Sequence, residues 1–231
     1  MLNLSDFDLL TFDCYGTLID WETGIFSALK PLLAAHEKPL ADAELLELYG
    51  DFELEAESGA YRTYREVLQS VVQAFGKRLS FTPSMKELNA LTDSFSTWRP
   101  WPDTVAALKR LTKRYRLAII SNTDDDLFDQ TRQYLPVEFD TVTTAQQAHC
   151  YKPALEIFRL ALGQAKVDPK RILHIGQSVY HDVLPAKALG LATVWVNRPS
   201  PRAGIGAVKQ AKGQPDLQVS DLETLANYAG C

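Results

Sequence analysis

Short apolar runs alternate with amphipathic segments after residue 102, and this alternation is the feature that most constrains the fold. The predicted strands lie at 117–122, 139–143, 171–176 and 191–196. The predicted helices between and before them lie at 103–115, 124–134, 152–164 and 183–189. Strands that are mostly apolar along their length, each followed by a helix, are typical of a parallel sheet covered on both faces. The sequence therefore predicts an α/β fold.

The first part of the chain is organised differently. A predicted strand at 9–12 ends at Asp13, and apolar residues then recur at helical spacing from residue 22 to residue 78. Pro31 should kink or restart the first helix. The other helices are predicted at 43–57, 61–75 and 83–95. We therefore expect an all-helical unit at 20–97, inserted after the first strand, and a sheet-containing unit made of 1–19 and 98–231.

Two features mark the end of the chain. Residues 198–214 are rich in Gly, Pro, Lys and Arg, which predicts a long loop. Residues 220–223 form a Ser-x-x-Glu pattern, which predicts a capping box at the start of the last helix.

Composition and charge exclude several classes of protein. The chain has 231 residues, with 24 basic and 29 acidic ones, and its net charge of −5 argues against a nucleic-acid partner. No stretch reaches the ~20 apolar residues of a membrane helix, so no membrane partner is expected. The first residues lack the pattern of a signal peptide. Cys14, Cys150 and Cys231 form no CxxC pair, which indicates a reducing cytoplasm.

Polar residues that could take part in catalysis follow four of the predicted segments. Asp13 follows the first strand, Ser121 and Asn122 end the second, Lys152 follows the loop after the third, and Asp182 lies six residues beyond Gly176. Alone, each has an ordinary explanation: a loop aspartate, a surface lysine, or an acidic residue favoured near a helix N-terminus. Because ligands bind at the carboxyl ends of strands in open α/β sheets, their joint occurrence there predicts a catalytic site.

These segments resemble a known family. They resemble the four motifs of the haloacid dehalogenase superfamily: Asp13-Cys14-Tyr15-Gly16-Thr17-Leu18, Ser121-Asn122, Lys152-Pro153 and Gly176-Gln177-Ser178-Val179-Tyr180-His181-Asp182. The resemblance implies a Rossmann-like parallel core of at least five strands. It also implies that the helical insert is a cap, that the active site lies under it, and that Asp13 is a nucleophile.

Many members of this superfamily are phosphatases, and two positions argue against that activity here. Phosphatases have Asp-x-Asp in the first motif, whereas this chain has Tyr15 at the second aspartate position. A phenol with a reference pKa near ~10 is a poor acid and base at neutral pH. Gln177 replaces a second carboxylate that would hold magnesium, a metal that prefers charged oxygen ligands. We therefore expect no metal and no cofactor.

The first motif resembles instead that of the type II (S)-2-haloacid dehalogenases. The resemblance implies that Asp13 attacks the α-carbon of a small carboxylate substrate, expels halide with inversion, and forms an ester that water hydrolyses. Lys152 would keep Asp13 ionised, and Asp182 would pair with Lys152 or orient the water. Hydrogen bonds to carboxylate oxygens would come from Thr17, Ser121 and Asn122.

The residues beside these motifs are candidates for substrate binding. They are Cys14, Tyr15, Tyr151, Gln177, Ser178, Tyr180 and His181. Cys14 has packing as its alternative role. In the cap, Arg62 or Arg65 is a candidate to clamp the substrate carboxylate. On the predicted helix Tyr61, Tyr64 and Arg65 share a face, and the alternative is an amphipathic helix with its arginines in water.

Several positions depart from the usual dehalogenase pattern. Gln177 and Val179 replace a serine and an asparagine, and Phe158 replaces a tyrosine. The segment 12–25 closely resembles the opening of azetidine-2-carboxylate hydrolase. Ring opening of a small cyclic amino acid is thus one alternative function, with His181 or Tyr180 as proton source.

A catalytically silent binding module is a second alternative. The joint presence of Asp13, Lys152 and Asp182 argues against it. Dimers are common among the relatives, so a homodimer is a further expectation.

Overall fold

The structure is a computed structural model that describes residues 2–198 and 206–231. In these ranges six strands form one sheet, in the order β3-β2-β1-β4-β5-β6, and every neighbouring pair is parallel. The strands are β1 (Leu9–Phe12), β2 (Arg116–Ser121), β3 (Thr141–Thr144), β4 (Ile172–Gly176), β5 (Ala192–Val196) and β6 (Leu217–Val219). All residues of β1 and β4 are buried, as strands covered on both faces require. The predicted α/β fold with a parallel sheet is confirmed.

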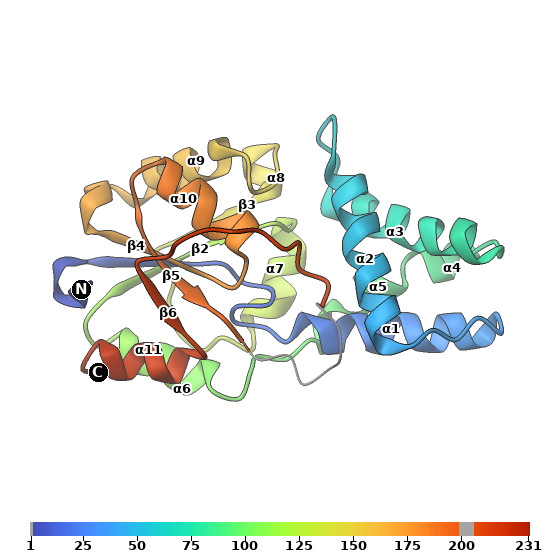
Figure 1. Ribbon diagram of the computed structural model, residues 1–231, viewed down its shortest axis with the longest axis horizontal. Helices are drawn as coiled ribbons and strands as arrows, with labels where there is room; N and C mark the ends of the chain where they lie inside the picture. Colours follow the sequence, from blue (N-terminus) through green and yellow to red (C-terminus); the bar gives the residue numbers. More distant parts are fainter. Residues whose placement is uncertain (1, 199–205) are drawn as a thin grey trace.

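Helices cover both faces of the sheet. In Figure 1, α9 (Leu155–Ala165) and α10 (Leu184–Ala188) lie over one face, and α6 (Thr104–Leu111) and α11 (Leu222–Tyr228) lie over the other. The remaining helices of this part are α7 (Asp125–Arg132), which follows β2, and α8 (Ala145–Ala148), which follows β3. Short helical turns occur at η1 (Leu4–Asp6), η3 (Pro169–Arg171) and η4 (Val179–Val183), the last of which is π-helical.

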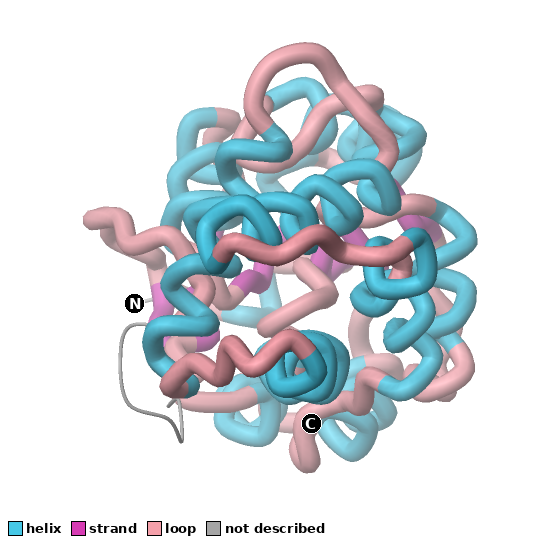
Figure 2. The backbone as a smooth tube through the Cα atoms, turned by 90° about the vertical axis from the view of Figure 1, so that its right-hand side faces the viewer, coloured by secondary structure: helices cyan, strands magenta, loops and turns pink. Residues whose placement is uncertain are grey.

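Helices inserted between β1 and β2 form a separate unit, which we call the cap. Its helices are α1 (Trp21–Ala35), α2 (Asp42–Glu57), α3 (Tyr64–Leu79), α4 (Met85–Leu88) and α5 (Ala90–Ser94), followed by the turn η2 (Phe95–Thr97). The cap stands beside the sheet in Figure 1 and faces the viewer in Figure 2. Its inner sides are apolar, with residues such as Leu29, Val67 and Phe75 fully buried. The cap is therefore a helical unit with an apolar interior of its own.

Four local predictions need correction. α1 continues through Pro31 instead of restarting there, and burial of residues such as Leu29 and Leu33 offsets the ~3 kcal/mol that proline costs in a helix. The predicted helix at 83–95 is divided into α4 and α5 at Asn89. The last helix is capped by Asp221, whose side chain accepts the Thr224 N–H, and not by a capping box at 220–223.

The fourth correction concerns the start of α3. The helix was predicted to begin at Tyr61, but it begins at Tyr64, because Thr63 and Glu66 form a capping box that satisfies both their backbone N–H groups. Tyr61 and Arg62 therefore precede the helix. The face that Tyr61, Tyr64 and Arg65 were predicted to share does not exist.

The sequence did not predict β6, which has only three residues. Part of the long loop predicted at 198–214 lies outside the described residues, namely 199–205. Residues 206–214 contain neither helix nor strand, as the prediction requires.

The cap is attached to the core by specific contacts at the start of α3. The Asp124 carboxylate, just before α7, accepts the backbone N–H groups of Tyr64 at 2.9 Å and Arg65 at 3.0 Å. The Tyr151 hydroxyl donates to the Arg62 carbonyl at 2.8 Å. These contacts fix the cap over the sheet edge at which β1, β2 and β4 end.

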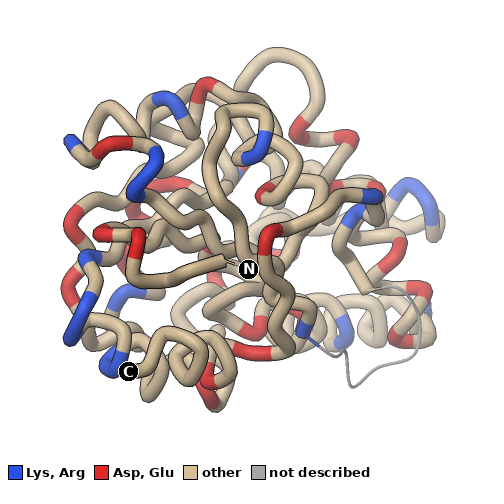
Figure 3. The backbone as a smooth tube through the Cα atoms, turned by 60° about the vertical axis from the view of Figure 1, so that its left-hand side comes forward, with Lys and Arg blue, Asp and Glu red and all other residues tan. Residues whose placement is uncertain are grey.

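Among the described residues, the basic side chains are not gathered on one face (Figure 3). Lys and Arg residues occur on both core and cap, and Asp and Glu residues lie among them (Figure 3). Within residues 2–198 and 206–231, no helix combines the length and the apolar character needed to cross a membrane.

Candidate active site

Asp13 follows β1, which lies between β2 and β4 in the sheet. Its backbone N–H donates to the Ile175 carbonyl at 2.9 Å, which continues the pairing with β4 for one residue. The residue is 7% exposed, and its Oδ2 accepts a hydrogen bond of 2.6 Å from Thr17. Asp13 is therefore fixed at the crevice where the strand order reverses, the usual ligand site in sheets of this kind.

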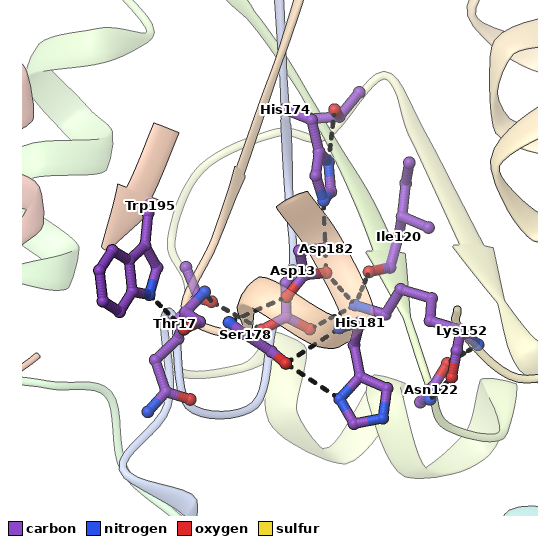
Figure 4. A network of polar contacts seen from close by, with 12 residues as sticks. Asp13, Thr17, Ile120, Asn122, Lys152, His174, Ser178, His181, Asp182 and Trp195 are labelled. Carbon is purple, nitrogen blue, oxygen red and sulfur yellow. Dashed lines mark hydrogen bonds and ion pairs between the residues drawn. The ribbon is translucent and has the colours of Figure 1, made fainter. Parts of the chain in front are cut away.

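Lys152 lies between two carboxylates (Figure 4). Its ammonium donates to Asp13 Oδ1 and Asp182 Oδ1, both at 2.7 Å, and to the Ile120 carbonyl at 3.1 Å. The side chain is 2% exposed. Burial lowers the pKa of Lys152, but the two carboxylates outweigh burial and hold it above its ordinary value. Lys152 thus stays charged.

The backbone of Lys152 is held as firmly as its side chain. Its N–H donates to Asn122 Oδ1 at 2.7 Å, and Asn122 Nδ2 donates to the Lys152 carbonyl at 3.2 Å. The peptide bond between Lys152 and Pro153 is cis. Asn122, predicted as a hydrogen-bond donor, thereby joins the end of β2 to the loop that carries the lysine.

Asp182 is positioned by the π-helical turn after β4. Its Oδ2 accepts the Ser178 N–H at 3.2 Å, and His174 Nε2 lies 3.3 Å from its Oδ1. The other ring nitrogen of His174 lies 3.0 Å from the Thr11 hydroxyl. A side chain at Gly176 would place Cβ 2.4 Å from the Asp182 carboxyl carbon. Glycine at position 176 therefore allows the Asp182 carboxylate to pack against the end of β4.

The two carboxylates differ in their affinity for protons. Burial raises the pKa of Asp182, but Lys152 and His174 outweigh burial and hold it below its usual range. Burial also raises the pKa of Asp13, and with the added effect of the Asp182 charge its pKa stays above the ordinary value despite Lys152. As pH falls, Asp13 takes up a proton first.

A cavity of about 70 Å³ lies between this cluster and the cap. At ~10–15 Å³ per water, this is room for roughly five waters. Nine of the predicted site residues line it: Asp13, Tyr15, Ser121, Asn122, Lys152, Gln177, Ser178, His181 and Asp182. The other lining residues are Trp21, Gly50, Glu53, Leu54, Glu57 and Tyr64 from the cap, and Ala207, Val208 and Lys209.

The other predicted site residues lie outside the cavity lining. Thr17 is behind Asp13, where it also accepts the Gln177 N–H at 2.8 Å. Cys14 is fully buried in the core, in keeping with its alternative role in packing. Tyr151 and Tyr180 line an adjoining pocket. Tyr151 also anchors the cap.

Neither candidate arginine points into the cavity. The Arg62 guanidinium donates to Ser70 Oγ at 3.0 Å and to the Ala56 carbonyl at 2.6 Å. The Arg65 guanidinium pairs with Asp126 at the surface. The partners of both guanidinium groups thus lie outside the cavity lining, with Arg62 held by the cap itself and Arg65 by Asp126 of α7.

Ser121 supplies a free donor inside the cavity. Its side chain is fully buried, and its hydroxyl has no hydrogen-bond partner among the described residues. A buried hydroxyl without a partner costs free energy unless a ligand pairs with it. A substrate carboxylate beside Lys152 would satisfy this hydroxyl.

Sequence reasoning missed two acidic residues of the cavity. Glu53 and Glu57 lie one turn apart on α2 and are half-buried. Glu53 Oε1 accepts hydrogen bonds from the hydroxyls of Tyr49 at 2.9 Å and Tyr64 at 2.6 Å. The sequence does contain a signal for the burial of Glu53, because Glu53 continues the buried stripe of Leu46 and Tyr49 at helical spacing.

His181 faces the cavity as a neutral ring. Burial lowers its pKa to about 4. Its Nδ1 lies 3.1 Å from Ser178 Oγ. At neutral pH this ring is uncharged, so one ring nitrogen can accept a hydrogen bond and the imidazolium form that could serve as a proton source is not populated.

The residues present do not match a magnesium site of the phosphatase type. The Tyr15 hydroxyl turns to Thr131 Oγ1 at 2.9 Å, and Gln177 offers an uncharged amide. The two remaining carboxylates both bind the Lys152 ammonium. Among the described residues, no group of three or more His, Cys, Asp and Glu side chains is arranged to hold a metal ion. We therefore derive no step through a metal.

Comparison with known proteins decides the family. Residues 7–190 match the haloacid dehalogenase-like hydrolases. This chain belongs to that family. It is 25% identical over 228 residues to (S)-2-haloacid dehalogenase H-109 of Pseudomonas putida, an alignment that covers 95% of this chain and 96% of that protein. It is 36% identical over 116 residues to haloacid dehalogenase-like hydrolase domain-containing protein 3 of Xenopus laevis, and there the chain spans about half of the relative's length, 48%.

A solved structure shows the same fold. L-2-haloacid dehalogenase from Xanthobacter autotrophicus, with chloropropionic acid covalently bound, superposes with a TM-score of 0.79 at 21% identity. The match covers 96% of this chain and 97% of that one. The family and the predicted fold are thus confirmed.

Proposed function

We propose that this protein hydrolyses small 2-haloalkanoic acids, such as haloacetate and (S)-2-halopropionate, through an ester on Asp13 and without a metal. The observation that carries the proposal is the placement of Asp13. Its carboxylate lines a small cavity and is held by Thr17 and by a buried Lys152. A carboxylate fixed in this way can attack carbon without needing an acid for a halide leaving group.

The reaction has two steps. An Asp13 oxygen attacks the α-carbon, the carbon–halogen bond breaks, and halide leaves with the bonding electrons, which inverts the carbon. Water then adds to the Asp13 carboxyl carbon, releasing the 2-hydroxy acid, one proton and free Asp13. The Lys152 ammonium and Thr17 hold the Asp13 oxygens throughout. Ser121 is the donor available for the substrate carboxylate.

The relatives support this proposal. The Pseudomonas protein is named as an (S)-2-haloacid dehalogenase and aligns over nearly the full length of both chains. The Xanthobacter structure holds chloropropionic acid covalently, which is the kind of adduct that the first step would form.

Halide release tests the proposal. Wild type, Asp13→Asn and the control Asp129→Asn, an exposed aspartate on α7, are incubated with chloroacetate and (S)-2-chloropropionate in the presence of EDTA. Wild type and control should release chloride, whereas Asp13→Asn should lose at least ~10³-fold in rate, as removal of a nucleophile does. In single turnover in H₂¹⁸O, mass spectrometry should find ¹⁸O in Asp13. Chloride release that survives in Asp13→Asn would exclude the ester route.

A second candidate is the ring-opening hydrolysis of azetidine-2-carboxylate or a similar small cyclic amino acid. The attack of Asp13 on a carbon beside a carboxylate is the same, and the ring nitrogen is the leaving atom. The observation in its favour is Glu53, which lines the cavity and accepts two tyrosine hydroxyls. A carboxylate there suits a cationic nitrogen. Turnover of azetidine-2-carboxylate without chloride release from any halo acid would favour this candidate.

A further inference from the structure

The geometry of displacement at carbon determines which residues meet the leaving atom. The nucleophile and the leaving atom lie on opposite sides of the carbon under attack. Asp13 approaches from the core, so the leaving atom points towards the cap. The acidic side chains that the cap contributes to the cavity are Glu53 and Glu57 of α2. These carboxyl groups are therefore on the side where the departing atom gains charge.

The two glutamates have different surroundings. Burial raises the pKa of Glu53, and the hydroxyl hydrogen bonds that its Oε1 accepts from Tyr49 and Tyr64 oppose this effect in part. Glu57 follows one helical turn later and faces the Glu53 charge. The pKa of Glu57 is raised further than that of Glu53, so of the two carboxyl groups Glu57 takes up a proton first.

The charge balance of the pocket agrees with this assignment. Burial and then the Glu53 charge raise the pKa of Glu57 well above its ordinary value, against smaller opposing effects of Lys152 and Asn122. His181 is neutral, with its pKa lowered to about 4 by burial. The Tyr15 hydroxyl is engaged with Thr131. Glu57 is thus the cavity group best suited to donate a proton.

We propose that Glu57 is a catalytic general acid, and that the enzyme opens strained oxygen rings on small carboxylic acids, such as oxirane-2-carboxylate. The inference rests on the Asp13 displacement proposed above. It extends that reaction to a leaving oxygen atom, which has to be protonated, whereas a leaving halide does not. Glu53 is a positioning residue that keeps the proton on Glu57.

The atoms balance over the cycle. An Asp13 oxygen bonds to the ring carbon beside the carboxylate, the carbon–oxygen bond breaks, and its electrons stay on the ring oxygen. That oxygen takes the Glu57 proton and becomes a hydroxyl group. Water then hydrolyses the Asp13 ester, and the proton released in this step returns to Glu57. The products are glyceric acid and the starting enzyme. Because the leaving oxygen stays tethered to the substrate, the product needs little more space than the substrate.

The test compares two leaving groups on one enzyme. Oxirane-2-carboxylate needs a proton on its leaving oxygen, whereas (S)-2-chloropropionate does not. Wild type should form glyceric acid. Glu57→Gln should lose at least ~10²-fold in kcat on the oxirane, the usual contribution of a general acid, and much less on the chloro acid. Glu55→Gln, at an exposed position of the same helix, should match wild type on both.

Contrary outcomes are distinguishable. Equal losses in kcat of Glu57→Gln on both substrates would overturn only the role of Glu57 and leave the Asp13 displacement in place. Chloride release by a wild type that leaves the oxirane intact would do the same. Failure on both substrates would overturn the Asp13 displacement as well. Infrared spectra at neutral pH provide a check without substrate. Wild type and Glu55→Gln should show the carbonyl band of a protonated carboxyl, and Glu57→Gln should lack it. Wild type without that band would contradict the assigned proton.

Discussion

At the scale of single residues, Lys152 determines whether two buried carboxylates can coexist. Its ammonium bonds to both Asp13 and Asp182. We expect Lys152→Met, which keeps the length of the side chain, to lower the free energy of unfolding by about 3–5 kcal/mol, since removal of one partner leaves buried charge uncompensated. Urea denaturation measures the change. Lys170→Met, at an exposed position, should stay within about 0.5 kcal/mol of wild type. A loss below 1 kcal/mol for Lys152→Met would mean that the carboxylates are compensated in another way.

The residues of the core cluster could be predicted from sequence for a physical reason. Asp13 and Asn122 follow parallel strands, and Lys152 follows the loop after a third strand. The carboxyl ends of parallel strands meet at one edge of the sheet, whatever the exact strand boundaries are. Glu53 and Glu57 could not be found in this way. Carboxylates on a helix ordinarily lie in solvent, and only the packing of α2 over the sheet edge turns these two into the cavity.

At the scale of elements, the start of α3 is capped from two directions. Thr63 and Glu66 form the local capping box, and Asp124 reaches across from the core to two further N–H groups. We expect Asp124→Ala to cost about 1–2 kcal/mol of stability, the upper range for loss of an N-cap. Hydrogen exchange at the amides of Tyr64 and Arg65 should accelerate. Asp129→Ala, at an exposed position of α7, should change neither quantity, and unchanged exchange in Asp124→Ala would contradict the proposed anchor.

The elements differ in how far their sequences determine them. The buried strands could be predicted because each apolar run is short, is bounded by turn residues and alternates with longer amphipathic segments. β6 could not, because three residues after a polar stretch carry little pattern, and its pairing with β5 supplies the structure. The start of α3 was readable in the Thr-x-x-Glu pattern at Thr63, which determines a helix start more sharply than the apolar spacing does. Because Arg62 precedes this helix start, helical spacing does not determine where its side chain points.

At the scale of the whole molecule, the cavity belongs to neither unit alone. The core supplies Asp13, Lys152 and Ser121, and the cap supplies Glu53 and Glu57. The sequence predicted a site under a cap, but the orientation of the cap depends on contacts such as that between Asp124 and Tyr64. Such contacts join residues about sixty positions apart, and no local sequence pattern predicts them. A ligand in this cavity touches both units and should therefore stabilise the molecule as a whole.

That stabilisation can be measured with the Asp13→Asn variant, in which substrate binds but does not react. At a concentration of (S)-2-chloropropionate one hundred times its Kd, binding adds about 2.7 kcal/mol. For a chain of this length this corresponds to a rise in Tm of roughly 5–10 °C. The uncharged 2-chloropropionamide at the same concentration should give a smaller rise. If the free Ser121 hydroxyl binds the carboxylate, adding Ser121→Ala should weaken binding of the acid about tenfold, the effect of losing one hydrogen bond to a charged group. It should leave binding of the amide nearly unchanged. Equal rises for acid and amide would show that the cavity does not recognise the carboxylate.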